Sequence, residues 1–407
     1  MFEQPSSIKD INRLRILNLL RVRPGISRTD IAAETGLAKA TISQLVSELI
    51  DDGVAYEDGT RPRPASPGRR PIKLSLTPEF RLAIGVELTG SECIATLTDL
   101  YADPLNLVRC PMSGSSIHSA VQVIVDAVSE LLKGRNKEDL LGVSVGVPGP
   151  VDASRKRVIQ AENIGWYDVP LAAMLEERIG IPIWLVKRTN AGALGEYWHG
   201  EGRGHENLVY VSVDIGVGSG IVINGQLYEG HNGSAGEIGH ITVDPDGARC
   251  VCGNYGCLET VASSRAIASR ARRRSELGKA GDLLSSSAKE DGELITGKMV
   301  VGAAAKGDAW AIHVVEEAAH YLGMAIATVI NLFNPSLVLL GGEILEAPDL
   351  FLKGIRDVVD RSVFSIPAEC VEIVPSSLGS QAAPIGAASL VLDEFFSSEQ
   401  IVHECIS

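Results

Sequence analysis

Two short runs, GEIGH at 236–240 and CVCGNYGCLE at 250–259, carry the most specific chemical signal in this sequence of 407 residues. They place one imidazole and three thiols within eighteen residues, separated by glycines that favour tight turns. Such a donor set is typical of a closed tetrahedral zinc site, which leaves no ligand position for water. The sequence therefore predicts a structural Zn²⁺ with four protein ligands: His240, Cys250, Cys252 and Cys257.

The composition is that of a globular protein, with 45% hydrophobic and 22% charged residues. A chain of this length is too long for one ordinary core, so two or three domains are expected. Its seven cysteines suit a metal site in a reducing compartment better than a disulfide framework. The start, MFEQP, lacks the features of a signal peptide, and no long apolar run occurs. The sequence therefore predicts a cytoplasmic protein without a membrane partner.

Residues 1–80 are predicted to form a winged helix-turn-helix DNA-binding domain. Apolar residues repeat at helical spacing from 8 to 20, and the SRTD run at 27–30 is a capping box for a second helix. Gly36 marks a tight turn, after which apolar residues between 42 and 50 define one face of a third helix. This succession is the helix-turn-helix arrangement. The alternative is a small helical module for protein interactions.

The DNA-contacting surface is expected on the third helix and on the wing that follows it. Opposite its apolar stripe, this helix carries side chains that can reach base edges: Lys39, Thr41, Ser43 and Gln44. Two strands, 54–56 and 72–76, flank a loop whose PGRRP run at 67–71 resembles the core of an AT-hook. Arg69 and Arg70 suit the narrow minor groove of A·T-rich DNA, whose negative potential attracts arginine. The alternative is a flexible linker with solvated arginines.

The charge distribution supports a nucleic-acid partner in spite of a net charge of −14. Residues 1–80 hold 12 Lys and Arg against 10 Asp and Glu, whereas residues 81–407 hold 25 against 41. Between residues 59 and 76 there are five basic residues and no acidic one. Because phosphate attraction acts within a Debye length, a local cationic stripe suffices. Double-stranded operator DNA is therefore the predicted partner.

From residue 81 onward, short apolar strands alternate with helices, which predicts an α/β fold. The expected strands are 84–88, 94–97, 141–147, 208–213 and 337–340. The expected helices are 120–132, 171–179 and 311–333.

The run with the four zinc ligands closely resembles the signature of the ROK family (repressors, open reading frames and sugar kinases), in particular its xylose and N-acetylglucosamine repressors. Supporting runs are GVPGPVD at 146–152, ENIGW at 162–166, GHNGSAG at 230–236, Asn334-Pro335 with Gly341-Gly342, and GAA at 386–388. The resemblance covers nearly the whole chain. It implies a two-lobed, actin-like (ribonuclease H-like) sugar-kinase body with sugar in the cleft, in a homodimer or homotetramer. The implied parts are a winged domain (1–80), a first lobe (81–195, completed by about 384–407), and a second lobe with the zinc loop and oligomerisation helices (196–383).

Departures from the family's kinase motifs predict that the cleft is catalytically inactive. Glu92 stands where the phosphate loop of a kinase carries lysine, and it would repel a nucleotide. In a second loop, Ile215 replaces a hydroxyl residue and Asp214 adds a negative charge. The catalytic aspartate matches Arg188, whose guanidinium cannot take a proton from a sugar hydroxyl near neutral pH. Because phosphoryl transfer depends on charge neutralisation and positioning, the chain is predicted not to be an enzyme.

The same resemblance assigns effector-binding residues in the cleft. They are Asn163, Lys187, Arg188, Glu237, His240 and Glu259, with His240 shared with the zinc set. Lys187 and Arg188 replace an Asn-Asp pair that holds sugar hydroxyls in the family, which leaves three hypotheses. The two cations pair with Glu237 or Glu259 and the pocket is closed or degraded; they form an anion site for a sugar phosphate or sugar acid; or a neutral sugar binds with altered contacts.

These features predict a DNA-binding repressor of carbohydrate-metabolism genes, controlled by a sugar or sugar-derivative effector. One alternative is a sugar kinase with unconventional catalysis, and another is a regulator controlled by a protein partner. The zinc loop is expected between the cleft and the interdomain surface, where it would relay effector binding.

Overall fold

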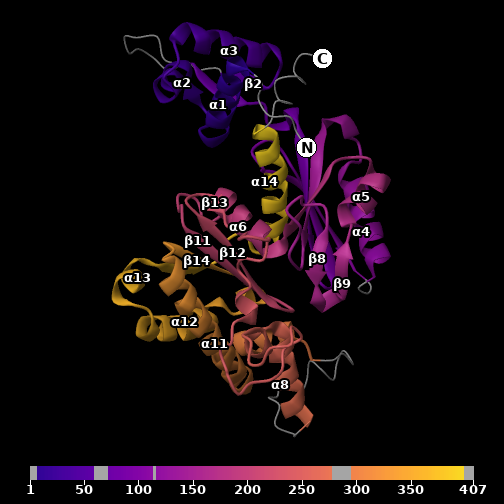
Figure 1. The fold of residues 1–407 in the computed structure, drawn as a ribbon, viewed down its shortest axis with the longest axis vertical. Coiled ribbons are helices and arrows are strands. Elements are labelled where there is room, and N and C mark those ends of the chain that lie inside the picture. Colours follow the sequence, from indigo (N-terminus) through magenta and orange to yellow (C-terminus); the bar gives the residue numbers. More distant parts are fainter. Residues whose placement is uncertain (1–6, 59–71, 113–115, 277–294, 398–407) are drawn as a thin grey trace.

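The structure, a computed structural model, describes residues 7–58, 72–112, 116–276 and 295–397 of the chain. Figure 1 shows a small helical domain at one end of the long axis and two α/β lobes below it. The α/β class and the N-terminal helix-turn-helix predicted from the sequence are confirmed. Within the described ranges, no helix is long and apolar enough to span a membrane.

The winged domain contains three helices and a small antiparallel sheet. The helices are α1 (Ile8–Val22), α2 (Arg28–Thr35) and α3 (Lys39–Asp51), and the strands, in sheet order, are β1 (Ile26–Ser27), β3 (Lys73–Leu76) and β2 (Ala55–Asp58). α2 begins at the predicted capping box, in which the Ser27 hydroxyl accepts from the Asp30 amide and the Asp30 carboxylate accepts from the Ser27 amide. It ends at Gly36, whose φ of +70° lies in the left-handed region that glycine adopts without strain. The wing loop, 59–71, lies outside the described residues.

The first lobe is built on a mixed five-stranded sheet. In sheet order the strands are β10 (Ile183–Lys187), β7 (Leu140–Val147), β4 (Leu82–Leu88), β5 (Glu92–Thr98) and β6 (Pro104–Pro111). Helices α4 (Ile117–Leu131) and α5 (Leu171–Ile179) cover one face, and α14 (Ala382–Phe396) packs on the other. Gly85 of β4 allows this approach, because a Cβ there would lie 1.8 Å from the Pro384 carbonyl oxygen of α14.

The second lobe holds another mixed sheet with a helical layer. In sheet order its strands are β13 (Gln226–Leu227), β12 (Val217–Ile223), β11 (Leu208–Val213), β14 (Leu337–Gly342) and β15 (Glu372–Pro375). The layer contains α8 (Ser264–Glu276), α10 (Gly297–Ala305), α11 (Ala309–Phe333) and α12 (Pro348–Ser362). The core lies where α11 packs on the sheet, with Val209, Val211, Leu322 and Ile326 buried together. Shorter elements are α7 (Glu259–Ala262), α13 (Ser365–Cys370) and the hairpin of β8 (Val158–Ala161) and β9 (Trp166–Val169).

Two helices, α14 and α6 (Arg188–His199), pack against each other between the lobes. Their contact depends on two glycines. A Cβ on Gly195 of α6 would lie 2.0 Å from the carbonyl oxygen of Ala382, and a Cβ on Gly386 of α14 would lie 1.8 Å from that of Ala191. The backbones therefore touch directly, and a shift of one helix must move the other.

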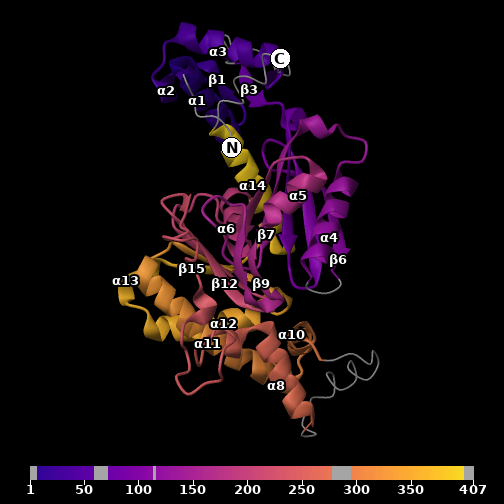
Figure 2. The same cartoon turned by 45° about the vertical axis from the view of Figure 1, so that its right-hand side comes forward.

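The winged domain shares a hydrophobic core with α14. Leu14, Leu17 and Leu20 of α1 are buried in the same cluster as Phe395 and Phe396 at the end of α14. Figures 1 and 2 both show α14 running from between the lobes to the underside of the winged domain. The winged domain is thus packed onto the body and not merely tethered to it.

Arg21 of α1 fixes this junction with polar and aromatic contacts. Its side chain is only 8% exposed, and Nη1 lies 2.6 Å from the Asp393 carboxylate of α14. The guanidinium carbon lies 4.9 Å from the ring centres of both Phe396 and Trp198, which is within the range of cation–π attraction. Trp198 belongs to the last turn of α6. Both interlobe helices therefore end against α1.

Candidate functional site

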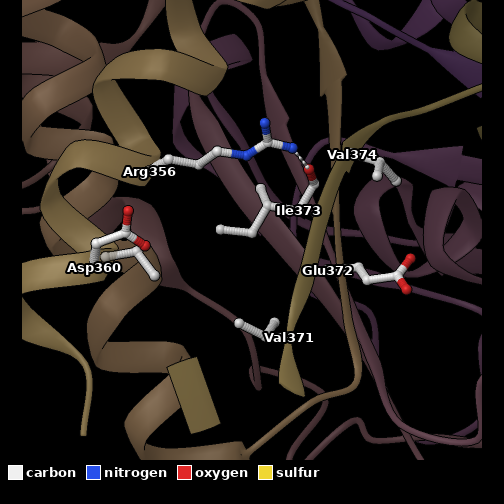
Figure 3. Close-up of a pocket in the computed structure, with 7 residues that line it drawn as sticks. Arg356, Asp360, Val371, Glu372, Ile373 and Val374 are labelled. Atoms are coloured by element: carbon white, nitrogen blue, oxygen red, sulfur yellow. Dashed lines mark hydrogen bonds between the residues drawn. The ribbon is translucent and has the colours of Figure 1, made fainter. Parts of the chain in front are cut away.

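A cavity of about 730 Å³ lies between the two lobes, a size typical of small-molecule sites. Its walls come from the turns after β4 and β7, the β8–β9 hairpin, the start of α6, the turn after β11 and parts of the 237–259 segment. A smaller depression of about 380 Å³ lies between α12 and the edge strand β15, where Arg356 donates to the Ile373 carbonyl (Figure 3). None of its described lining residues is a predicted site residue. The interlobe cavity is therefore the candidate ligand site.

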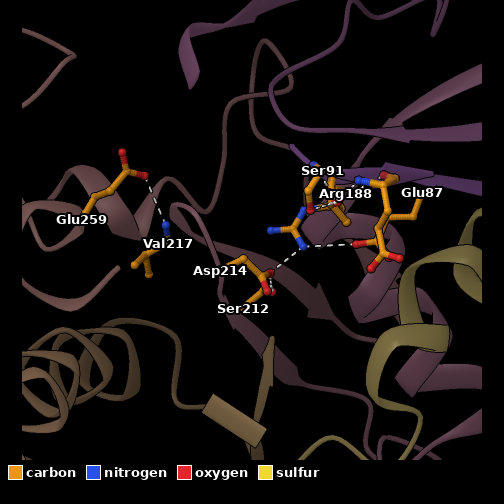
Figure 4. Close-up of polar contacts among 9 residues, drawn as sticks. Glu87, Ser91, Arg188, Ser212, Asp214, Val217 and Glu259 are labelled. Atoms are coloured by element: carbon orange, nitrogen blue, oxygen red, sulfur yellow. Dashed lines mark hydrogen bonds and ion pairs between the residues drawn. The ribbon is translucent and has the colours of Figure 1, made fainter. Parts of the chain in front are cut away.

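One arginine joins both lobes at the wall of this cavity. Arg188, the first residue of α6, donates to Asp214 Oδ2 at 2.6 Å and to Glu87 Oε1 at 3.1 Å (Figure 4). Glu87 belongs to β4 of the first lobe, and Asp214 follows β11 of the second lobe. The Ser212 hydroxyl donates a further hydrogen bond of 2.6 Å to Asp214. We call Glu87, Arg188 and Asp214 the interlobe ion triad.

Burial and proximity set the ionisation of the triad. Burial raises the pKa of Glu87 to about 7, and the Arg188 guanidinium opposes that rise only in part. Burial also acts to raise the pKa of Asp214, but Arg188 and the Ser212 hydroxyl outweigh it and bring that pKa below its usual value. Burial opposes the charge of Arg188, yet the two carboxylates outweigh it and raise the pKa of Arg188. The triad therefore keeps Arg188 and Asp214 charged, while Glu87 titrates near neutrality.

Lys187, at the end of β10, is held by internal contacts as well. Its Nζ lies 3.0 Å from Glu237 Oε1 and donates to the Ala235 carbonyl oxygen at 2.6 Å. The side chain of Lys187 is only 6% exposed. This contact links the first-lobe sheet to the 236–240 run of the second lobe, so it is a second ion pair across the cleft.

Sequence reasoning missed the partners of Arg188. The ion-pairing hypothesis named Glu237 or Glu259 for both cations, and Arg188 instead contacts Glu87 and Asp214. Glu259 has other partners, since its carboxylate accepts from the Val217 amide at 3.2 Å and pairs with Arg265 at 3.2 Å. Ion pairing of both cations leaves the cavity open.

Most of the predicted effector-binding residues meet at the cavity. Those that line it are Lys187, Arg188, Glu237, His240 and Glu259. Glu162 and Ile164, which flank Asn163 in the sequence, also line the cavity. The side chain of Asn163 itself lies outside the described residues. The structure adds the carboxylates of Glu162 and Glu343 to the wall. Both lie at runs that the sequence analysis singled out: Glu162 is the first residue of ENIGW, and Glu343 follows Gly341-Gly342.

The four predicted zinc ligands come together beside the cavity. Their donor atoms all lie within 4.8 Å of one another. Cys250 Sγ is 3.7 Å from His240 Nδ1, and Cys252 Sγ is 3.7 Å from Cys257 Sγ. A tetrahedron with Zn–S bonds of about 2.3 Å has S···S edges of about 3.8 Å. The donor set can therefore hold a metal ion, and its chemistry fits zinc.

The helix predicted to read DNA, α3, lies on the side of the winged domain that faces away from the lobes (Figures 1 and 2). Of its predicted contact residues, Thr41 is half-buried, and the other three are exposed: Lys39, Ser43 and Gln44. The opposite face of α3 is buried through Ile42, Leu45 and Leu49. Arg69 and Arg70 lie outside the described residues, so their role in the wing stays a prediction.

The fold and the site define a class of protein: a winged helix-turn-helix joined to a body whose two α/β lobes enclose a ligand-sized cavity. A family model described as winged helix-turn-helix DNA-binding matches residues 9–55. The model of the ROK family matches residues 83–394. The chain belongs to the ROK family, as the resemblance in its sequence indicated.

Three known proteins show the extent of the similarity. The xylose repressor of Caldicellulosiruptor bescii is 31% identical over 393 residues, which are 96% of this chain and 97% of the repressor. A solved ROK family transcriptional regulator, a homolog of the E. coli MLC protein, has a TM-score of 0.81 at 28% identity and covers 98% of this chain and 100% of its own. A ROK family glucokinase from Streptomyces griseus, solved with glucose and AMPPNP, has a TM-score of 0.69 at 33% identity and covers 76% of this chain and 98% of its own. Both regulators match almost the whole chain.

Proposed function

We propose that the protein is a sugar-responsive transcriptional repressor of carbohydrate-metabolism genes. The junction carries this proposal, because the winged domain shares its core with α14, and α14 packs against α6, whose first residues line the cavity. The near full-length similarity to a xylose repressor supports it. In this proposal a homodimer or homotetramer acts in the cytoplasm on double-stranded operator DNA. Helix α3 enters the major groove, and Arg69 and Arg70 of the wing enter the minor groove.

We infer that the cleft binds a sugar without phosphorylating it. A kinase needs a base that takes a proton from the sugar hydroxyl, and the matching position holds Arg188, a permanent cation in the interlobe ion triad. Glu92, which also lines the cavity, would repel the phosphates of a nucleotide. Both residues depart from the kinase motifs of the family, as the sequence resemblance implies.

We propose that His240, Cys250, Cys252 and Cys257 hold a structural Zn²⁺. Four protein ligands leave no open position, so the ion would stabilise the loop and take no part in a reaction. Because His240 and Cys252 also line the cavity, the same loop would fix one wall of the effector site.

We propose that effector binding reaches the DNA-binding domain along α6 and α14. Helix α6 carries Arg188 at the cavity and Trp198 against Arg21, so one rigid element contacts both places. The zinc loop was the expected relay, but its apolar residues Ile238 and Leu258 pack in the core of the second lobe. A change in lobe closure would instead shift α6 and α14 and thereby reorient α1.

Substitution of Arg21 by methionine tests this route. The variant keeps an apolar stem at the junction but loses the ion pair with Asp393 and the contact with Trp198. Operator affinity without sugar should stay within about threefold, while release of DNA by sugar should need at least about fivefold more sugar, since a coupling energy of 1 kcal/mol is worth that factor. Fluorescence anisotropy of a labelled operator measures both. Arg23→Met, at the exposed residue that caps the end of α1, is the control. Unaltered release in Arg21→Met would exclude this junction as the relay.

The decisive experiment is selection of bound duplexes from a random DNA pool, followed by a screen of sugars that release the selected operator. Release by a sugar is the expected result. The same sugars tested for ATP consumption distinguish a kinase, which would consume nucleotide. Release by a cell protein in the absence of every sugar would favour control by a protein partner.

The double variant Lys39→Ala, Gln44→Ala should weaken operator binding at least about tenfold, because each lost base or phosphate contact costs on the order of 1 kcal/mol or more. The dependence of affinity on salt should also become shallower by about one counterion, through Lys39. Salt titrations of DNA binding measure both effects. The matched control, Gln122→Ala on α4 with Lys133→Ala in the turn that follows it, should bind as the wild type does. Unchanged affinity in the α3 variant would remove this helix as the reading element.

A further inference from the structure

Carboxylates outnumber cations on the wall of the interlobe cavity. The lining carboxylates are those of Glu92, Glu162, Asp214, Glu237, Glu259 and Glu343, and the lining cations are Lys187, Arg188 and Lys298. With all of these described groups ionised, the excess is three negative charges. Charges that line a cleft act on a ligand more strongly than charges in open solvent, because little water screens them.

Each of the three lining cations has a carboxylate partner. Arg188 contacts Asp214 and Glu87, as described above, and Lys187 contacts Glu237. Lys298 lies at the rim, 67% exposed, and its Nζ is 3.3 Å from Glu346 Oε1. The charge of each cation is therefore already offset by a carboxylate before an anionic ligand approaches, inside the protein for Lys187 and Arg188 and at the exposed rim for Lys298. An anion gains less attraction from such a pair than from an unpaired cation, because the carboxylate of the pair repels it.

Three backbone amides of the facing turns already have hydrogen-bond acceptors. In the turn after β4, the Thr89 hydroxyl accepts hydrogen bonds from the amides of Ser91 and Glu92 at 3.3 and 3.0 Å. In the turn after β11, the Val217 amide donates to the Glu259 carboxylate at 3.2 Å. Groups of free amides are what backbone turns offer to a phosphate, and here these amides already have acceptors.

The same two turns touch across the cavity. A Cβ on Gly90 of the first turn would lie 2.5 Å from Ile215 Cδ1 of the second. An apolar side chain thus lies between the two turns, and a phosphate beside it would lose water without gaining a partner.

We infer that the effector is an uncharged saccharide and that sugars bearing a phosphate or a carboxylate are excluded from the cavity. This inference rests on the proposed sugar response and specifies its ligand. Carboxylates are hydrogen-bond acceptors only, and sugar hydroxyls supply donors in several directions around the ring. A phosphate at neutral pH supplies acceptors and negative charge, so it faces wall groups of its own kind. The hypothesis of an anion site formed by Lys187 and Arg188 predicts the opposite preference.

Isothermal titration calorimetry on the full-length protein tests this with matched pairs: D-xylose, D-glucose and N-acetylglucosamine, each against its own phosphate ester. At least one uncharged sugar should bind, and its phosphate should bind at least about tenfold more weakly. A phosphate that binds as tightly as its parent sugar, or more tightly, overturns the inference and leaves the sugar response intact. If no member of any pair binds while the protein still binds its selected operator, the proposed sugar response fails, and the inference fails with it.

Two variants test whether the charges of the cavity wall cause the preference for an uncharged sugar over its phosphate. Asp214→Asn removes one carboxylate and releases Arg188 from its closer partner, so the affinity ratio of sugar to phosphate should fall at least about threefold. Glu92→Gln removes a charge from a side chain that is 39% exposed, which leaves folding unperturbed, and should lower the ratio in the same direction. Asp357→Asn makes the same chemical change at an exposed site on α12 and should leave the ratio unchanged. An unchanged ratio in both cavity variants overturns the electrostatic account.

Discussion

Replacement of Arg188 by alanine is expected to lower the free energy of unfolding by about 3 to 5 kcal/mol. The side chains of Arg188 and Glu87 are only 16% and 6% exposed, so the variant would leave two carboxylates in a poorly hydrated place without a cation. It would also remove the contact that joins β4 of one lobe to the β11 turn of the other. Urea-induced unfolding at pH 8, followed by circular dichroism, measures the loss.

A surface ion pair supplies the control for this prediction. Arg135→Ala removes a pair with Glu79, of which the side chains are 33% and 55% exposed, and should cost less than about 1 kcal/mol. A similar loss in both arginine variants would contradict the burial argument.

The pH dependence of the Arg188→Ala variant identifies the cause of its instability. Without the cation, the pKa values of Glu87 and Asp214 should rise above those of the unfolded chain. A carboxyl with a raised pKa contributes stability that is complete below its unfolded pKa and is lost as the pH rises through the folded value. The pKa of Glu87 is already about 7 with Arg188 present. The difference in the free energy of unfolding between the variant and the wild type should therefore be smaller at pH 5 than at pH 8. An equal difference at both pH values would exclude unpaired carboxylates as the cause.

The substitution Cys257→Ser is expected to abolish zinc binding and sugar binding together. Cys257 is buried and supplies one of four clustered donors, and a serine hydroxyl does not replace a thiolate as a zinc ligand. Structural zinc sites contribute on the order of 10 kcal/mol to local folding, so the 236–259 loop should lose its shape. His240 and Cys252 of that loop line the cavity. Metal analysis should show a fall from about one zinc per chain to nearly none, and calorimetry should show no heat with the cognate sugar.

Two comparisons separate the metal from the thiol itself. Cys110→Ser changes a half-buried cysteine outside the cluster and should keep both zinc and sugar binding. Wild-type protein stripped with a chelator should behave as the Cys257→Ser variant does. Zinc retained at full stoichiometry in the variant would refute the ligand assignment, and sugar binding that survives loss of zinc would refute the structural role of the loop.

Local signals in the sequence were sufficient for the winged domain and for the metal cluster. The capping box at Ser27 and the left-handed turn at Gly36 both depend on residues within a few positions of each other. The four clustered His and Cys donors likewise lie within one short run, separated by turn-forming glycines. In both cases the chain has little freedom between the interacting groups, so spacing alone constrains the geometry.

The interlobe ion triad and the domain junction could not be predicted in this way. Glu87 and Arg188 are 101 residues apart. Arg188 and Asp214 were each interpreted from the sequence as a separate loss of kinase chemistry, although their opposite charges compensate each other. Helix α14 is buried almost all round, which indicates an internal position but does not identify its neighbours. Its contact with α1 joins residues 372 positions apart, Arg21 and Asp393. Only the three-dimensional arrangement shows that partnership.

The position of α14 has a consequence for the order in which the protein is made. A ribosome releases α1 long before it reaches Phe395 and Phe396, against which the leucines of α1 are buried. The winged domain therefore leaves the ribosome with part of its apolar core uncovered, and α14, the last helix of the described residues, covers it later. Chains truncated before α14 leave this apolar surface exposed to solvent, and exposed apolar surface is recognised by chaperones and proteases. We therefore expect full-length chains, and not truncated ones, to accumulate and occupy the operator.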